Sequence, residues 1–112
     1  MKRNVVFLLA CMFAMAGALP VSAGSTKTLK DVLGRYFLVG AAMNVDQIWN
    51  RTPDETNVVK NNFNSIVAEN CMKGEEIHPE ENRFFWDDAD RFVKFGQDNG
   101  LAIIGHCLVW HS

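Results

Sequence analysis

Residues 64–73 read Asn-Ser-Ile-Val-Ala-Glu-Asn-Cys-Met-Lys, and this stretch points to the fold class. Its first half contains Ser65–Ala68, a short apolar run that predicts a buried β-strand. Its second half turns polar, with Glu69, Asn70 and Lys73. In parallel α/β proteins, binding and catalytic side chains collect where the strands end. The stretch therefore predicts a strand that delivers three polar side chains to one edge of a sheet.

The sequence before this strand predicts a helix and another strand. Residues 52–55, Thr-Pro-Asp-Glu, place Thr at the cap, Pro at the first helical position and Glu three residues after the cap. This arrangement predicts a helix that starts with a capping box. Residues 37–43, Phe-Leu-Val-Gly-Ala-Ala-Met, form a continuous apolar run. Such a run predicts a strand buried on both faces. The polar residues 24–34 predict a short helix packed on the body.

The sequence after residue 73 predicts a second helix and a third strand. Residues 75–81 form an acidic loop that Pro79 interrupts. Asp87 and Asp88 suit the positive end of a helix, and Asn99-Gly100 is a strong helix stop. The inner face of this helix is predicted at a spacing of i, i+3, i+4 and i+7. Its residues are Ala89, Phe92, Val93 and Gly96. The apolar residues 101–109 follow as the third strand.

The resulting order of strand, helix, strand, helix, strand predicts the α/β class. Alternation of this kind favours right-handed βαβ units and a parallel sheet. The pattern alone leaves open whether the sheet is a barrel or an open one. Gly40 stands alone after the first strand, without a glycine-rich phosphate loop. A dinucleotide-binding sheet is therefore disfavoured.

The first 23 residues have the layout of a secretory signal peptide. Lys2 and Arg3 precede an apolar run over residues 5–18, and Val21-Ser22-Ala23 resembles a cleavage site. The apolar run is shorter than the roughly 20 residues that a membrane-spanning helix needs. We therefore expect a signal peptide over 1–23, cleavage near Ala23 and a secreted or periplasmic chain over 24–112. Lipoprotein anchoring at Cys11 is the less favoured alternative, because the apolar run continues beyond that cysteine.

Charge and cysteine content narrow the function further. The 112 residues carry a formal net charge of −2, which becomes −4 when Lys2 and Arg3 leave with the signal peptide. A mildly acidic chain gives no indication of nucleic-acid binding, which needs a basic face. Cys71 and Cys107 could pair outside the cytoplasm, but two buried free thiols are the simpler expectation.

The third predicted strand carries residues that suggest either a metal or a sugar. If it is regular, His106 and Trp110 share one face, while Cys107 and His111 share the other. Cys107 and His111 would then stand about 13 Å apart, which disfavours a metal site unless the strand has already ended. A histidine that donates to a hydroxyl, beside a flat indole, suits a sugar. The alternative is that Trp110 is a core residue and His106 a buried histidine with a satisfied hydrogen bond.

The polar residues after the second strand also suit hydroxyl groups. The carboxylate of Glu69, the amide of Asn70 and the ammonium group of Lys73 can together accept from and donate to several hydroxyls. The alternative is a Glu69–Lys73 salt bridge at the end of a strand. Glu75 and its acidic neighbours are most simply a solvated loop.

Two stretches together resemble glycoside hydrolase family 10, which consists chiefly of endo-β-1,4-xylanases. Residues 64–73 resemble the second-strand signature of that family, and residues 105–112, Gly-His-Cys-Leu-Val-Trp-His-Ser, resemble its third-strand signature. Residues 37–42 are similar to its first strand. The order and spacing agree from about residue 29 onward. Gly74 departs from the family, which usually has Trp there, and Cys107 stands where Thr is usual.

The resemblance implies a (β/α)8 barrel that cleaves the β-1,4-xylan backbone with retention, of which this chain holds about three βα units. It implies that Glu69, Asn70 and Lys73 bind a glycone-side sugar, and that His106 and Trp110 line the subsite of the sugar that is cleaved. The substrate would be xylan or a xylooligosaccharide. No cofactor, metal, nucleic acid or membrane span is expected.

The resemblance also places both catalytic carboxyl groups after strands four and seven, beyond these residues. Retaining glycosidases need two such groups about 5–5.5 Å apart. We therefore assign no catalytic residue here and expect the chain alone neither to fold stably nor to hydrolyse xylan. The remainder of the barrel, on a following segment, would be its partner. The alternatives are a non-catalytic protein that binds xylan or oligosaccharides, and an unrelated metal-dependent hydrolase.

Overall fold

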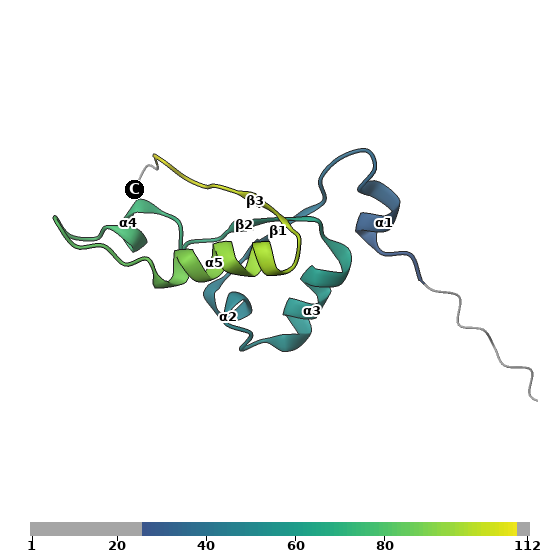
Figure 1. The fold of residues 1–112 in the computed structure, drawn as a ribbon, viewed down its shortest axis with the longest axis horizontal. Coiled ribbons are helices and arrows are strands. Elements are labelled where there is room, and N and C mark those ends of the chain that lie inside the picture. Colours follow the sequence, from purple (N-terminus) through teal and green to yellow (C-terminus); the bar gives the residue numbers. More distant parts are fainter. Residues whose placement is uncertain (1–25, 110–112) are drawn as a thin grey trace, which may run out of the picture.

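The computed structural model describes residues 26–109 and contains a parallel three-stranded sheet with helices (Figure 1). The strands are β1 (Gly40–Met43), β2 (Ser65–Ala68) and β3 (Ala102–Ile104). The helices are α1 (Leu29–Leu33), α2 (Val45–Ile48), α3 (Pro53–Asn62), α4 (Gly74–Ile77) and α5 (Asp87–Asp98). The strand order β1-β2-β3 follows the chain. The predicted alternation of parallel strands and helices is confirmed.

The helices α2, α3 and α5 lie on the same side of the sheet (Figure 1). Helix α5 packs against β2 and β3, and α2 contacts both α3 and α5. The apolar core lies between these helices and the sheet. It consists of Met43, Ile48, Val59, Ile66, Ala68, Cys71, Phe92, Phe95 and Leu101. Burial of these side chains is the main force that fixes the orientation of the sheet on its helices.

The first strand is shorter and less covered than the sequence predicted. Ordered pairing starts at Gly40, and the preceding Phe37 and Leu38 are exposed. Along the strand Met43 is buried, whereas Gly40 and Ala42 are exposed. The prediction of burial on both faces is therefore wrong for the described residues, because their helices cover one face of the sheet only.

The third strand also ends earlier than predicted. The prediction placed it over residues 101–109, but pairing stops at Ile104, which lies opposite Val67 of β2. Strand β2 itself ends at Ala68, so the residues beyond Ile104 soon lose their ladder partner. Leu108 and Val109 are fully exposed or nearly so. The predicted alternation of faces over residues 106–111 therefore does not hold for the described part of this segment.

The start of α3 is where the sequence predicted it, but the predicted capping box is wrong. Thr52 is the cap residue and Pro53 the first helical residue, yet the Thr52 side chain makes no capping hydrogen bond. Its Oγ1 is buried without a hydrogen-bond partner. The carboxylate of Glu55 does not reach back to the cap, because it accepts from Nε2 of Gln47 at 2.9 Å. A capping box forms instead at α2, between Asn44 and Gln47.

The predicted short helix in the polar lead-in is confirmed as α1. Thr28 caps it through a capping box with Asp31. Hydrogen bonds from the side chain and the backbone of Thr28 lower the pKa of Asp31 below its ordinary value. The cap is thus complete at neutral pH, and it weakens as acid protonates this carboxylate.

Helix α5 follows the sequence prediction closely. It begins at Asp87, and its buried residues include Ala89, Phe92 and Gly96, with Val93 half-buried. It ends before Asn99-Gly100, where Gly100 has a φ of 63°. The glycine suits this left-handed position because it has no Cβ. The acidic residues 75–81, predicted as a loop, in part form the short helix α4.

Candidate functional site

The carboxyl ends of β1 and β2 lie side by side and bring together residues that are far apart in the sequence. Met43, the last residue of β1, pairs with Ala68, the last residue of β2. The backbone N–H of Glu69 donates to the carbonyl of Met43 at 2.9 Å. This bond extends the ladder by one step. Asn44 and Glu69 therefore leave the sheet at the same edge, as the sequence predicted.

A pocket of about 430 Å³ lies at this edge. It is lined by Asn44, Val45, Asp46, Arg51, Glu69 and Asn70. The lining combines amide, carboxylate and guanidinium groups, so it offers both hydrogen-bond donors and acceptors. We call it the edge pocket. Its size falls within the range of small-molecule sites.

The three polar residues that were predicted after β2 form a compact turn. The backbone N–H of Lys73 donates to the carbonyl of Asn70 at 2.8 Å. The side chains repeat this link, because Nζ of Lys73 donates to Oδ1 of Asn70 at 2.8 Å. Glu69 and Asn70 are exposed, and Lys73 is half-buried. The turn thus presents a carboxylate, an amide and an ammonium group. Two of its residues, Glu69 and Asn70, line the edge pocket.

His106 lies in a different pocket. This cavity of about 490 Å³ is mainly apolar, and it has His106 in its wall. The other lining residues are Met72, Gly74, Ile77, His78, Trp86, Gly105, Cys107 and Leu108. His106 is half-buried and lies just beyond the end of β3. Trp110, its predicted companion, lies outside the described residues.

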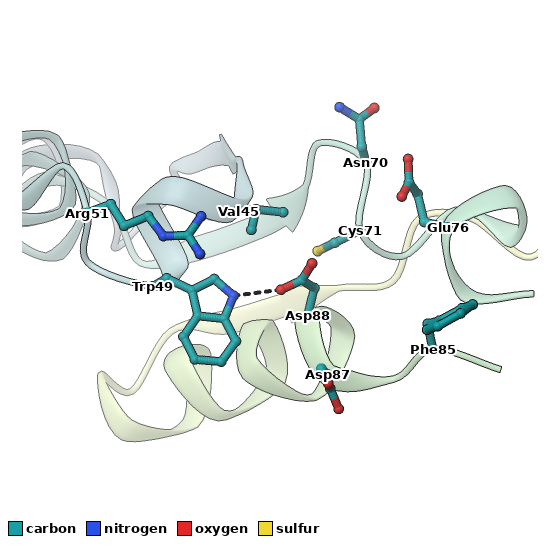
Figure 2. Close-up of a pocket in the computed structure, with 9 residues that line it drawn as sticks. All are labelled: Val45, Trp49, Arg51, Asn70, Cys71, Glu76, Phe85, Asp87 and Asp88. Carbon is teal, nitrogen blue, oxygen red and sulfur yellow. Dashed lines mark hydrogen bonds between the residues drawn. The ribbon is translucent and has the colours of Figure 1, made fainter.

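A third pocket, of about 460 Å³, adjoins the edge pocket (Figure 2). Both pockets share Val45, Arg51 and Asn70. The indole Nε1 of Trp49 donates to Oδ1 of Asp88 at 2.6 Å and thereby ties α2 to α5. Neither Trp49 nor Arg51 was predicted as a site residue from the sequence. Trp49 and Arg51 follow α2, a helix that was not predicted. The hydrogen bond of Trp49 joins residues 39 positions apart and could not be seen in the sequence.

The two cysteines of the described residues differ in their burial. Cys71 is buried and Cys107 half-buried, and both are free thiols. Burial, followed by the charges of Asp88 and Glu76, raises the pKa of Cys71. This thiol is therefore protonated at neutral pH. Among residues 26–109, no group of three His, Cys, Asp or Glu side chains is placed to hold a metal ion. His111 lies outside this range.

The described helices were compared with the length and apolar character that a membrane-spanning helix needs. Within residues 26–109, none is long and apolar enough to cross a bilayer. The predicted signal peptide, residues 1–23, lies outside the described range.

Comparison with known proteins assigns the chain to a family. The model of glycosyl hydrolase family 10 matches residues 28–112. The chain belongs to glycosyl hydrolase family 10. The predicted resemblance of the chain to this family is thereby confirmed.

Two of the similar proteins are xylanases. The endo-1,4-beta-xylanase A of Xylanibacter ruminicola is 52% identical over 102 residues, which are 91% of this chain and 28% of that protein. The beta-1,4-xylanase of Dictyoglomus thermophilum is 40% identical over 85 residues, 76% of this chain and 23% of that protein. The chain thus spans about a quarter of the length of these relatives.

Solved structures share the fold of this chain. A psychrophilic family-10 endo-beta-1,4-xylanase is 42% identical, with a TM-score of 0.71 over 77% of this chain and 26% of that one. An E139A mutant structure in complex with xylotriose is 29% identical, with a TM-score of 0.69 over 76% of this chain and 25% of that one. The three parallel strands and their helices are therefore part of a (β/α)8 barrel, as predicted.

Proposed function

We propose that this chain forms the N-terminal part of a secreted endo-1,4-β-xylanase and binds the glycone side of xylan. The observation that carries this proposal is the turn formed by Glu69, Asn70 and Lys73 at the carboxyl end of β2. Lys73 is held to Asn70 by a hydrogen bond of 2.8 Å, while the carboxylate of Glu69 is exposed to a ligand. One of the similar structures is a complex with xylotriose, which supports a xylose-based ligand.

Each residue has a distinct role in this proposal. The carboxylate of Glu69 accepts hydrogen bonds from sugar hydroxyls, the amide of Asn70 both donates and accepts, and the ammonium group of Lys73 donates. His106 and Trp110 line the next subsite, where the bond is cleaved. Hydrogen bonds to the charged groups are the strongest of these contacts.

The hydrolytic step needs groups that we do not assign to residues 1–112. Cleavage with retention uses a nucleophilic carboxylate and an acid/base carboxyl about 5–5.5 Å apart. Glu69 is engaged in substrate binding in this proposal, and Glu75 lies on the exposed helix α4. We propose that the remaining barrel strands supply both carboxyl groups, and that the chain alone is inactive.

The proposal includes export of the protein. Residues 1–23 act as a signal peptide, cleavage occurs near Ala23, and residues 24–112 enter the secreted or periplasmic enzyme. The charged start at Lys2 and Arg3 and the apolar run after it support this proposal. Lipid attachment at Cys11 is the less favoured route.

The proposed function is tested with a hybrid xylanase, in which this chain replaces the matching segment of the Xylanibacter ruminicola xylanase. We expect the hybrid to release reducing sugar from xylan, whereas the chain alone releases none. A chain that melts cooperatively and hydrolyses xylan by itself would contradict the proposal. A chain that binds xylooligosaccharides by itself without turnover would instead support a non-catalytic binding protein. Added chelator should leave the hybrid's activity unchanged.

The hybrid also tests the close packing of α5 on the sheet at Gly96. A Cβ at this position would lie 2.6 Å from Cγ1 of Ile103 and 3.2 Å from Cδ1 of Ile66. We expect Gly96→Ala to lower the free energy of unfolding by about 2 kcal/mol through overpacking, although alanine favours helices. The measurement is urea unfolding of the hybrid. Gly74→Ala is the matched control, because a Cβ there meets nothing within 4 Å. Equal stability of both variants would refute this packing argument.

A further inference from the structure

The turn after β2 is anchored beside two segments that are far from it in the sequence. Its middle residue, Cys71, is buried in the core, whereas Glu69 and Asn70 before it are exposed. Asn70 and Cys71 line the third pocket together with Trp49, which follows α2, and Asp88, which lies in the first turn of α5. The buried part of the turn therefore lies at a junction between α2 and α5.

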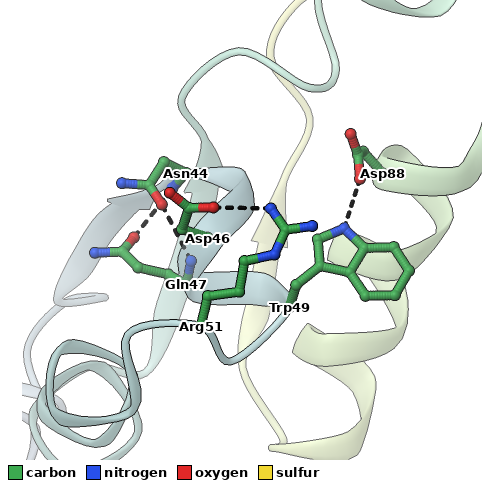
Figure 3. A network of polar contacts seen from close by, with 6 residues as sticks. All are labelled: Asn44, Asp46, Gln47, Trp49, Arg51 and Asp88. Carbon is green, nitrogen blue, oxygen red and sulfur yellow. Dashed lines mark hydrogen bonds and ion pairs between the residues drawn. The ribbon is translucent and has the colours of Figure 1, made fainter.

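Trp49 holds this junction together through two contacts with α5. Its indole Nε1 donates to Oδ1 of Asp88 at 2.6 Å (Figure 3). Because the acceptor is a carboxylate, this bond is of the stronger, charge-assisted kind. The guanidinium carbon of Arg91 lies over the Trp49 ring, 5.2 Å from its centroid, and Nε of the same arginine donates to the carbonyl of Ile48 at 3.0 Å. The end of α2 is thus fixed on α5.

Asp88 also lies next to the turn. In Figure 2 its carboxylate lies between the indole of Trp49 and the thiol of Cys71. Burial raises the pKa of this thiol, and the negative charge of Asp88 raises it further, which agrees with a short separation between the two side chains. Asp88 therefore connects the position of Trp49 with that of the buried residue that anchors the turn.

A second hydrogen bond of α2 points to a different neighbour and serves as a comparison. Nε2 of Gln47 donates to Oε2 of Glu55 at 2.9 Å and so links α2 to α3. Among the described residues, the linings of the edge pocket and the third pocket do not include Glu55. Loss of this bond loosens α2 on its α3 side only, so Glu55 provides a matched control for Asp88.

We propose that the hydrogen bond between Trp49 and Asp88 positions the turn after β2 for sugar binding. Asp88 is a positioning residue in this proposal, because it touches no substrate and acts by holding Trp49 on α5 beside Cys71. Without the bond, α2 and α5 separate at this point, and Asn70 and Lys73 leave the geometry in which they bind the sugar. This inference rests on the proposed function and adds two residues to it.

The test measures kcat and KM of the hybrid xylanase on xylohexaose, together with the melting temperature. We expect Asp88→Ala to raise KM about tenfold, the equivalent of about one hydrogen bond to the sugar, and to leave kcat within about twofold. Trp49→Phe keeps an aromatic ring but removes the N–H donor, so it should raise KM equally. Asp88→Asn should keep KM within about twofold of the unaltered hybrid, because its amide oxygen can still accept from the indole. Glu55→Ala should leave KM unchanged.

A double variant shows whether Trp49 and Asp88 act through their shared bond. If they do, Trp49→Phe combined with Asp88→Ala should raise KM no further than either change alone, about tenfold. Independent effects would multiply to about 100-fold and would overturn the proposal. If Asp88→Ala does not fold, Trp49→Phe and Asp88→Asn carry the same test, because the first removes the bond and the second keeps it.

The outcomes distinguish this inference from the proposed function. An active hybrid in which Asp88→Ala lowers the melting temperature but leaves KM unchanged would overturn the positioning role and leave the proposed function intact. A rise in KM of the same size for Glu55→Ala would also overturn the positioning role, since any loosening of α2 would then have this effect. A folded hybrid without activity on xylan would overturn the proposed function, and the positioning role with it.

Discussion

Replacing Glu69 with alanine is expected to lower kcat/KM of the hybrid xylanase on xylan about 100-fold. Glu69 directly follows β2, and its backbone N–H donates to the carbonyl of Met43 at 2.9 Å. An ionised acceptor that bonds two hydroxyls contributes roughly 3 kcal/mol, because each charged hydrogen bond is worth about 1.5–3 kcal/mol. A loss of this size corresponds to about two orders of magnitude in kcat/KM.

The matched control for this substitution is Glu75→Ala. Glu75 is also exposed and lies six positions further along, on α4. Its replacement should leave kcat/KM within about twofold, since exposed charges away from a site contribute little. Melting temperatures of both variants should match that of the unaltered hybrid. Equal activity of the two variants would show that Glu69 does not bind the substrate.

Replacing Phe92 with alanine is expected to lower the free energy of unfolding of the hybrid by about 4 kcal/mol. Phe92 is fully buried at the centre of the face that α5 presents to the sheet. Its truncation removes apolar burial and leaves a cavity between α5 and the core, and both effects destabilise the fold. The measurement is urea unfolding, with the midpoint and the slope determined for each variant.

Phe84→Ala provides the control for this effect. Phe84 is 54% exposed, and its ring stacks with the rings of His78 and Trp86. Its loss should cost about 1 kcal/mol or less, since such stacking contributes roughly 0.5–1.5 kcal/mol even in buried pairs. If Phe84→Ala destabilised the hybrid as much as Phe92→Ala does, the core would not lie where the structure places it.

The parts of the fold that follow from local pattern were predictable. Strand β2 occupies the residues that its apolar run indicated, because it has a partner on each side. Helix α5 could be predicted from its acidic start, its apolar spacing and its glycine stop. The end of β3 could not be predicted, since it depends on where β2 ceases to offer a partner.

The candidate site was predictable only in part. Glu69, Asn70 and Lys73 follow one another in the sequence, so their proximity was visible there. Arg51 was not, because it reaches the edge pocket from the segment that follows α2, a helix of only four residues that was not predicted. The Asn44–Gln47 capping box is the local feature that could have indicated this helix.

A crystal structure of the hybrid xylanase with bound xylotriose would show directly whether the turn after β2 holds the sugar. We predict hydroxyl oxygens of one xylose unit within hydrogen-bond distance of the carboxylate of Glu69, the amide of Asn70 and Nζ of Lys73. A xylotriose bound elsewhere, for example on the exposed rings of Phe84 and Trp86, with these three side chains making no sugar contacts, would contradict the proposed binding site.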